Sequence, residues 1–295
     1  MPNSDPAFTS RFVLASDGLR LHVRDYGPRD SDAIPVVCLA GLTRNSADFD
    51  ALALALSQGK MGNPRRVLAL DYRGRGLSDW DAGARYDMTT ENADILSVLD
   101  ACEVGRAVFV GTSRGGLHAM VLAVTRPTVL HAVVLNDVGP VIEAQGLARI
   151  KTYVGKLPPP RDWADALDLV KRMNAQMFPA IGDDAWRIFL RQTFEEKDGR
   201  LSARYDPRLA DTLKDFDIEK PLPDLWPQFE ALKGVPLLAL RGANSDLLAQ
   251  NTLEEMQKRH PNCAVHLVDG EAHAPLLLDT TSIGSILEFV VRVDA

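Results

Sequence analysis

The sequence is poor in several residue types, and each shortage argues against a class of protein. It has three cysteines in 295 residues, Cys38, Cys102 and Cys263, which are far apart and each lie among apolar neighbours. This odd number and wide spacing favour reduced core side chains over disulfides or a metal site. Lys and Arg number 33 against 40 Asp and Glu, giving a formal net charge of −7. That balance argues against general binding to nucleic-acid phosphates.

Long apolar runs are missing as well. No stretch of about 18 uncharged apolar residues occurs, so the sequence predicts no membrane span. The opening MPNSDPAFTSRFVLASDG lacks the charged region and the continuous apolar stretch of a signal peptide. His22, His260 and His266 have no ligand spacing with acids or cysteines, which argues against a metal site. Together these absences predict a cytoplasmic protein without a bound metal.

What remains is an ordinary globular composition, with 46% apolar and 25% charged residues. In the first half of the chain, short apolar runs alternate with helical patterns, which predicts a parallel α/β sheet with right-handed crossovers. An initial hairpin turns at Ser16-Asp17-Gly18. The expected strands are 12–15, 21–26, 35–40, 66–71, 107–112 and 132–136, and the expected helices are 46–58, 89–102 and 114–125.

The alternation stops after Pro140. Residues 141–226 show helical pieces at 163–177 and 184–195, separated by prolines, and no convincing buried strand. Strands at 236–241 and 264–268 and helices at 248–259 and 281–293 then resume the pattern. We therefore expect a core domain of residues 1–140 and 227–295 with a helical cap, 141–226, inserted after the sixth strand. The aromatic and Met side chains of the cap should mostly form its own core, with a minority lining a substrate pocket.

The strand at 107–112 ends in Gly111-Thr112-Ser113-Arg114-Gly115, directly before a helical pattern. This is the G-x-S-x-G pattern in the strand–turn–helix context of a nucleophile elbow. The glycines on either side of the serine avoid a collision across the tight turn. A serine nucleophile needs a base and a carboxylate that orients it. Asp246, on a loop after the seventh strand, and His273, before the last helix, follow in the required order.

With these motifs, the chain over residues 10–293 resembles the α/β-hydrolase superfamily, in its serine esterase and lactonase branch with a helical cap. The resemblance implies a mostly parallel eight-stranded sheet flanked by helices. It also implies Ser113 as nucleophile, Asp246 as acid and His273 as base. Some family members place the acid at the end of the sixth strand, which makes Asp137 the alternative acid.

The same resemblance suggests an oxyanion hole. The loop 39–44 follows the third strand, and the expected donors are the backbone N–H groups of Leu42 and Arg114. Ala40 stands where the family usually has histidine, so the support of this loop differs. The segment 71–78 matches a D-x-R-G-x-G-x-S turn of the family, in which Arg73 is expected to brace the turn by hydrogen bonds.

Several other residues have two interpretations. Arg44 and Arg114 should project near the mouth of the active site and could bind an anionic substrate group, or they could pair with carboxylates such as Asp48. The structural alternative is favoured. His118 and His131 lie in apolar stretches and are expected to be structural.

The predicted function is hydrolysis of a small carboxylic ester or lactone through an acyl-enzyme, without a cofactor. Three alternatives share the triad: cleavage of a carbon–carbon bond or an amide, cofactor-free perhydrolysis through the same acyl-enzyme, and a small-molecule receptor that hydrolyses its ligand slowly. No nucleic-acid or membrane partner is expected.

Overall fold

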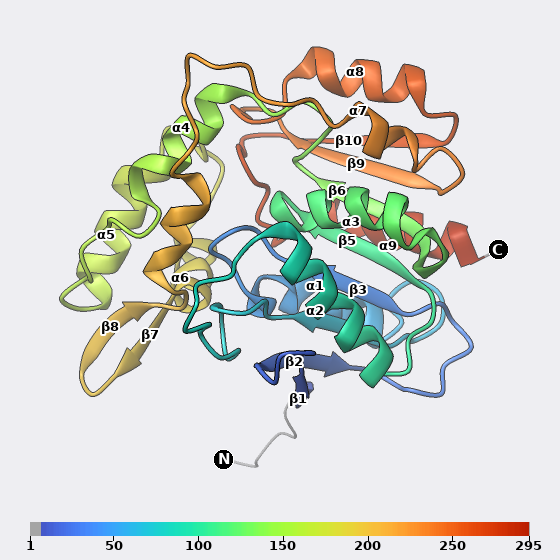
Figure 1. The fold of residues 1–295 in the computed structure, drawn as a ribbon, viewed down its shortest axis with the longest axis horizontal. Coiled ribbons are helices and arrows are strands. Elements are labelled where there is room, and N and C mark those ends of the chain that lie inside the picture. Colours follow the sequence, from blue (N-terminus) through green and yellow to red (C-terminus); the bar gives the residue numbers. More distant parts are fainter. Residues whose placement is uncertain (1–6, 295) are drawn as a thin grey trace.

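The computed structural model describes residues 7–294, so the first six residues of the predicted core domain lie outside it. Its centre is one eight-stranded sheet in the order β1-β2-β4-β3-β5-β6-β9-β10 (Figure 1). Pairing is antiparallel for β1–β2 and β2–β4 and parallel for all the other neighbours. The predicted mostly parallel eight-stranded sheet is confirmed. Its strands are β1 (Thr9–Leu14), β2 (Arg20–Tyr26), β3 (Val36–Leu39), β4 (Val67–Leu70), β5 (Ala107–Thr112), β6 (Leu130–Asn136), β9 (Leu237–Gly242) and β10 (Cys263–Val268).

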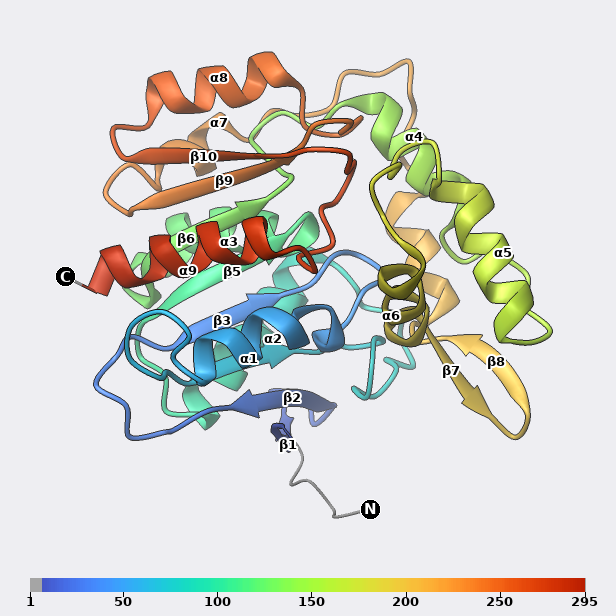
Figure 2. The same ribbon diagram turned by 180° about the vertical axis from the view of Figure 1, so that it is seen from behind.

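Helices cover both faces of this sheet. Figure 1 shows α2, α3, α7 and α8 on the near side, and Figure 2 shows α1 and α9 on the opposite side. A short 3-10 turn, η1 (Ser46–Phe49), precedes α1, and another, η2 (Pro127–Val129), follows α3. The helices are α1 (Asp50–Ser57), α2 (Met88–Ala101), α3 (Arg114–Thr125), α7 (Trp226–Glu230), α8 (Gln250–Arg259) and α9 (Thr280–Asp294).

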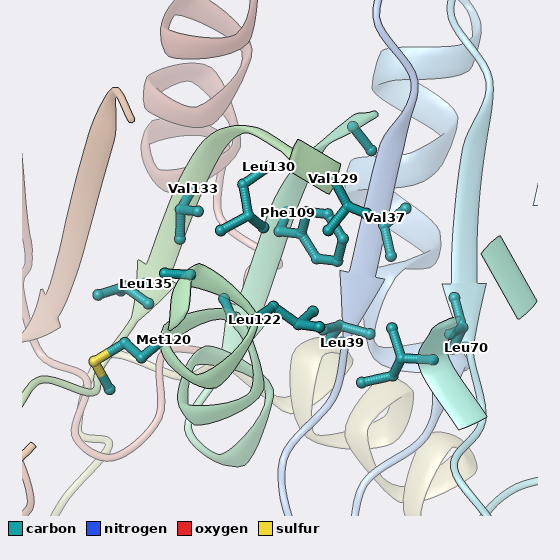
Figure 3. Close-up of a cluster of buried hydrophobic side chains, with 14 of the residues drawn as sticks. Val37, Leu39, Leu70, Phe109, Met120, Leu122, Val129, Leu130, Val133 and Leu135 are labelled. Atoms are coloured by element: carbon teal, nitrogen blue, oxygen red, sulfur yellow. The ribbon is translucent and has the colours of Figure 1, made fainter. Parts of the chain in front are cut away.

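Strand β5 shows why both faces need helices. Alternate side chains of a strand point to opposite faces of the sheet. Phe109 packs in the hydrophobic cluster beneath α3 (Figure 3), and Val108 and Val110 pack in the cluster on the other face. All three side chains are fully buried. A central parallel strand of this kind reads as a continuous apolar run, and such runs indicated the sheet in the sequence.

Residues 141–226 follow β6 and extend to the first residue of α7, and we call this segment the cap. Its elements gather at one end of the sheet (Figure 1). A two-stranded hairpin went unpredicted, although Asp198-Gly199, both with positive φ, form the two-residue turn that such a dipeptide favours. The elements of the cap are α4 (Ala144–Tyr153), α5 (Trp163–Asn174), α6 (Asp183–Thr193), β7 (Phe194–Lys197), β8 (Arg200–Ala203) and the 3-10 helix η3 (Pro207–Leu213).

The arginines in and just before the turn at 71–78 form ion pairs within the protein. Arg73 is almost fully buried and donates hydrogen bonds to three carboxylates, which belong to Asp17, Asp81 and Asp94. Arg65 pairs with Asp294 at 2.6 Å, and Arg66 pairs with Asp25 at 2.9 Å. The turn at 71–78 is therefore held by ion pairs between segments distant in the sequence.

The three cysteines are free thiols, and Cys38 and Cys102 are buried. Burial raises the pKa of Cys38, so this thiol stays protonated and behaves as a small apolar side chain. Among the helices of residues 7–294, none is long and apolar enough to span a membrane.

Candidate active site

Ser113 occupies the sharp turn between β5 and α3. Its backbone has φ +51° and ψ −113°, a conformation that L-residues rarely adopt. A Cβ atom added at Gly111 would lie 2.4 Å from the carbonyl carbon of Gly115, and one added at Gly115 would lie 2.0 Å from the carbonyl oxygen of Leu39. The turn therefore requires glycine on both sides of the serine. Both the strained serine and its two glycines match the predicted nucleophile elbow.

His273 connects Ser113 to a buried carboxylate. The Ser113 hydroxyl lies 2.9 Å from Nε2 of His273, and Nδ1–H of the same ring donates to Oδ2 of Asp137 at 2.8 Å. Asp137 comes directly after β6 and is fully buried. A neutral imidazole with its proton on Nδ1 can accept the serine proton at Nε2. The three side chains thus lie in the order and at the distances that a nucleophile, a base and an orienting carboxylate require.

Two further donors hold the Asp137 carboxylate. The backbone N–H of Gly242 donates to Oδ1 at 2.9 Å, and the hydroxyl of Ser245 donates to Oδ2 at 2.6 Å. Gly242 is the last residue of β9, and Ser245 lies on the loop that follows it. Together with His273, three donors surround a buried carboxylate. These donors fix the orientation of the carboxylate toward Nδ1–H of His273.

The sequence-based choice of Asp246 as the partner of His273 is wrong. Asp246 accepts two hydrogen bonds from Arg149 of α4, at 2.6 and 2.9 Å. A hydrogen bond from the Ser245 N–H to the Gly242 carbonyl oxygen closes a turn in the loop after β9. Because of this turn, Ser245, the residue before Asp246, contacts Asp137 beside His273. Partial burial opposes ionisation of Asp246, but its hydrogen bonds with Arg149 and the positive charge of that side chain keep its pKa below the usual range. Asp246 thus joins the core to the cap.

The expected oxyanion loop lies beside the nucleophile. A Cβ atom added at Gly41 would lie 3.9 Å from the Ser113 Cβ. Within residues 7–294, the backbone N–H groups of Leu42 and Arg114 donate to no other protein group, so both are free to bind an oxyanion. The side chain of Arg75 donates to the carbonyl oxygen of Leu42 at 2.9 Å and supports the loop in which the family histidine is replaced by Ala40.

A cavity of about 130 Å³ lies over Ser113, between the core and the cap. The cap supplies apolar side chains, Phe178, Trp186 and Phe189, as the expected minority of cap residues that line a pocket. It also supplies four polar residues that no sequence pattern singled out, Arg149, Tyr153, Asn174 and Gln192. The first two are four residues apart on α4, which places their side chains on one face of that helix.

Comparisons with known proteins agree with this fold. A model of the alpha/beta hydrolase family matches residues 36–280. The chain belongs to the α/β-hydrolase family. It is 31% identical to the 3-hydroxybutyrate-oligomer hydrolase of Cupriavidus necator over 94% of this chain and 96% of that protein. It is 27% identical to the 2-(acetamidomethylene)succinate hydrolase of Mesorhizobium japonicum over 79% of both. A crystal structure of an alpha/beta hydrolase from Novosphingobium aromaticivorans superposes with a TM-score of 0.88 at 34% identity, covering 98% of this chain and 100% of that one. These matches support hydrolase activity.

In this α/β hydrolase, the expectation that the Arg114 side chain projects near the mouth of the active site is wrong. It donates to Glu91 at 2.6 Å and to the carbonyl oxygen of Tyr86 at 2.6 Å, outside the cavity lining. Arg44 does line the cavity, but it pairs with Asp48 at 2.5 Å, as the structural alternative proposed. Its guanidinium also stacks over the Phe189 ring.

Glu91 is the centre of a buried ionic network of this α/β hydrolase, behind the nucleophile helix. It is fully buried and contacts Arg75, Arg114 and His118. Burial alone would favour the protonated carboxyl, but the two arginines and His118 lower the pKa of Glu91 strongly. Burial lowers the pKa of His118, so its ring is neutral. His118 and His131, which contacts the carbonyl oxygen of Val293, are structural, as expected.

Proposed function

We propose that the protein is a serine hydrolase that cleaves a small carboxylic ester or lactone through an acyl-enzyme. The observation that carries this proposal is the hydrogen-bonded chain from Ser113 through His273 to Asp137 at the bottom of the cavity. Ser113 is the nucleophile, His273 the base and Asp137 the acid that orients it. Residues 141–226 act as the cap that walls the site.

In the first half of the reaction, His273 Nε2 takes the hydroxyl proton as Ser113 Oγ attacks the substrate carbonyl carbon. The carbonyl oxygen becomes an oxyanion that accepts hydrogen bonds from the backbone N–H groups of Leu42 and Arg114. In comparable sites, such a donor is worth about 3–4 kcal/mol. The leaving alcohol takes the proton back from His273 as its carbon–oxygen bond breaks. Water then attacks the acyl-enzyme with His273 again as base, which releases the acid and restores Ser113.

The size of the cavity limits the substrate. About 130 Å³ is well below the roughly 300–1,000 Å³ of sites for drug-sized ligands. A short acyl group fits this space. The similarity to a 3-hydroxybutyrate-oligomer hydrolase agrees with an ester of a short acid. Carbon–carbon or amide cleavage by the same three residues is the alternative to be separated by substrate.

Covalent labelling combined with a substrate panel tests the proposal. A fluorophosphonate should add its mass to the peptide that contains Ser113, and the Ser113→Ala variant should remain unlabelled. Wild type should cleave p-nitrophenyl acetate and butyrate much faster than the octanoate, and Ser113→Ala should lose this activity by several orders of magnitude with its stability unchanged. Labelling of another serine with Ser113 unmodified would falsify the assignment. Turnover of amides or diketones but not esters would contradict the substrate class.

A further inference from the structure

Two polar side chains of the cap face the same space as the nucleophile. Arg149 and Tyr153 lie four residues apart on α4, and both line the cavity that also contains Ser113 and His273. This spacing places them on one face of the helix. They lie in a wall that also carries the apolar cap side chains Phe178 and Trp186, and the triad and the oxyanion hole do not use them.

The two cavity-lining arginines differ in the donors that they leave free. Arg44 uses all three nitrogens, with Nε and Nη2 on Asp48 and Nη1 on Thr193. Arg149 uses Nε and Nη2 on Asp246, and its guanidinium also lies in hydrogen-bonding contact with the Tyr153 hydroxyl; Nη1 has no carboxylate or carbonyl acceptor among residues 7–294. Asp246 is not part of the cavity lining. Asp246 therefore contacts the side of the guanidinium that faces away from the cavity, and Nη1 of Arg149 is left to donate into the cavity.

Tyr153 supplies a second free donor beside the first. Burial raises the pKa of its hydroxyl, against the opposing positive charge of Arg149 and a hydrogen bond between the two side chains, so the hydroxyl stays protonated at neutral pH. Because a guanidinium can only donate, Arg149 contacts the hydroxyl oxygen, and the hydroxyl proton meets no acceptor in the described part of the chain. Donors enclosed in a site without a partner disfavour a ligand that leaves them unpaired, because their lost hydration is not replaced.

The charges around the cavity decide what kind of acceptor fits these donors. Arg44 is matched by Asp48, and Arg149 is matched by Asp246. The carboxylate of Asp137 beneath His273 is therefore left as an unmatched negative charge when the imidazole is neutral. A free carboxylate on the substrate would enter a site that is already negative, whereas a ketone, hydroxyl or ester oxygen would meet two donors without that repulsion.

We propose that Arg149 and Tyr153 bind a neutral oxygen acceptor carried by the substrate a few atoms from the scissile carbonyl. The preferred substrates are then esters of short oxo or hydroxy acids, or of hydroxy-acid chains, rather than plain alkyl esters or half-esters with a free carboxylate. This inference rests on the proposed function and specifies its substrate class. Asp246 is a positioning residue that orients Arg149.

Three methyl esters of nearly equal size test the inference, because they differ only at the remote end. Methyl pentanoate ends in an ethyl group, methyl levulinate carries a ketone there, and monomethyl succinate carries a carboxylate. We expect kcat/KM for the levulinate to exceed that for the pentanoate by about tenfold, as one to two hydrogen bonds imply. The succinate half-ester should be cleaved more slowly than the levulinate.

Two variants test whether Arg149 and Tyr153 cause the preference for the levulinate. Tyr153→Phe removes only the hydroxyl, and Arg149→Lys keeps the charge beside Asp246 but removes the guanidinium edge. Each should lower the ratio of kcat/KM for the levulinate to kcat/KM for the pentanoate by about three- to tenfold. Tyr72→Phe is the matched control, because its hydroxyl is buried outside the cavity lining, and it should not change the levulinate-to-pentanoate ratio.

The outcomes separate this inference from the proposed function. Equal rates for all three esters, or a fastest rate for the succinate half-ester, would overturn the neutral-acceptor site while ester hydrolysis stands. A preference for the levulinate that survives both variants would also overturn it. Failure of the proposed function differs, because no ester would be cleaved and Ser113 would stay unlabelled by the fluorophosphonate.

Discussion

Ser113 and Asp137 leave the sheet side by side. Thr112, the last residue of β5, is paired with Asn136, the last residue of β6. Ser113 and Asp137 directly follow these two residues. The backbone N–H of Ser113 donates to the carbonyl oxygen of Asn136 at 3.0 Å. The register of two parallel strands therefore brings the serine and the carboxylate to one edge of the sheet. His273 then needs only to approach that edge to contact both.

This relationship leads to a prediction about the acid. Asp137→Asn should lower kcat by up to about ten-thousandfold, because an amide no longer fixes the productive tautomer or stabilises the imidazolium. Asp246→Asn should leave kcat nearly unchanged, since its partner is Arg149 and not His273. Steady-state kinetics on p-nitrophenyl butyrate, with circular dichroism to check the fold, measures both effects.

The control for the acid prediction is the double variant. If Asp137 alone is the acid, Asp246→Asn should add little to the loss caused by Asp137→Asn. A larger kcat loss in Asp246→Asn than in Asp137→Asn would return the role to Asp246. Small losses in both single variants and a large loss in the double variant would mean that either carboxylate can serve.

The sequence alone predicted those features that depend on a short run of neighbouring residues. The apolar strands, the G-x-S-x-G turn and His273 are visible as short patterns, and the structure places Ser113 and His273 within hydrogen-bonding distance. The choice of acid depended on the path of a loop. Asp137 and Asp246 both follow a strand, and only the turn made by Ser245 decides which carboxylate faces the histidine.

The residues of the cavity wall could not be predicted from the sequence either, because their contacts are made between distant segments. Arg149 faces the cavity and meets Asp246, which lies 97 positions away, so nothing near Arg149 in the sequence signals its partner. Arg114 shows the converse. It follows the nucleophile directly, but its side chain turns away to Glu91, which is buried on α2. The G-x-S-x-G motif predicts where the backbone of Arg114 lies but not the direction of its side chain.

The two arginines named from the sequence should act on stability more than on selectivity. Arg114→Gln removes one partner of buried Glu91, and we expect a loss below the about 3–5 kcal/mol typical of a broken buried pair, because Arg75 still neutralises Glu91. Urea unfolding measures this loss. The ratio of kcat/KM for monomethyl succinate to that for methyl levulinate should stay constant in Arg114→Gln and Arg44→Gln. A selective loss on the half-ester would show that one of them binds the carboxylate.

Glu271 predicts a pH dependence of stability. Burial and the charge of Asp279 raise its pKa to about 7, against the opposing hydrogen bond from the backbone N–H of Leu276. The folded protein therefore holds a proton between about pH 4.3 and 7 that the unfolded chain has lost, so this group's contribution to stability falls as pH rises through that window.

The variant that tests this pH dependence is Glu271→Gln, which keeps an acceptor for the Leu276 N–H but cannot ionise. Its free energy of unfolding relative to wild type should rise between pH 5 and pH 8, by at most about 3–4 kcal/mol. Urea unfolding at the two pH values gives the comparison. A difference between variant and wild type that is the same at both pH values would show that Glu271 does not titrate in this range.

The elbow glycines give the last prediction. An alanine at Gly115 would place its Cβ 2.0 Å from the carbonyl oxygen of Leu39, which is backbone of β3 and cannot rotate away. We expect Gly115→Ala to lower the free energy of unfolding by about 1–3 kcal/mol or more and to slow fluorophosphonate labelling of Ser113, because α3 must shift against the sheet. Gly284→Ala in α9 is the matched control, since its added Cβ meets no atom within 4 Å. It should be neutral or stabilise the helix by up to about 1 kcal/mol, and labelling should not change. Equal stability and labelling rates for the two variants would mean that the turn tolerates a side chain at Gly115, so that the strain at Ser113 does not depend on this contact.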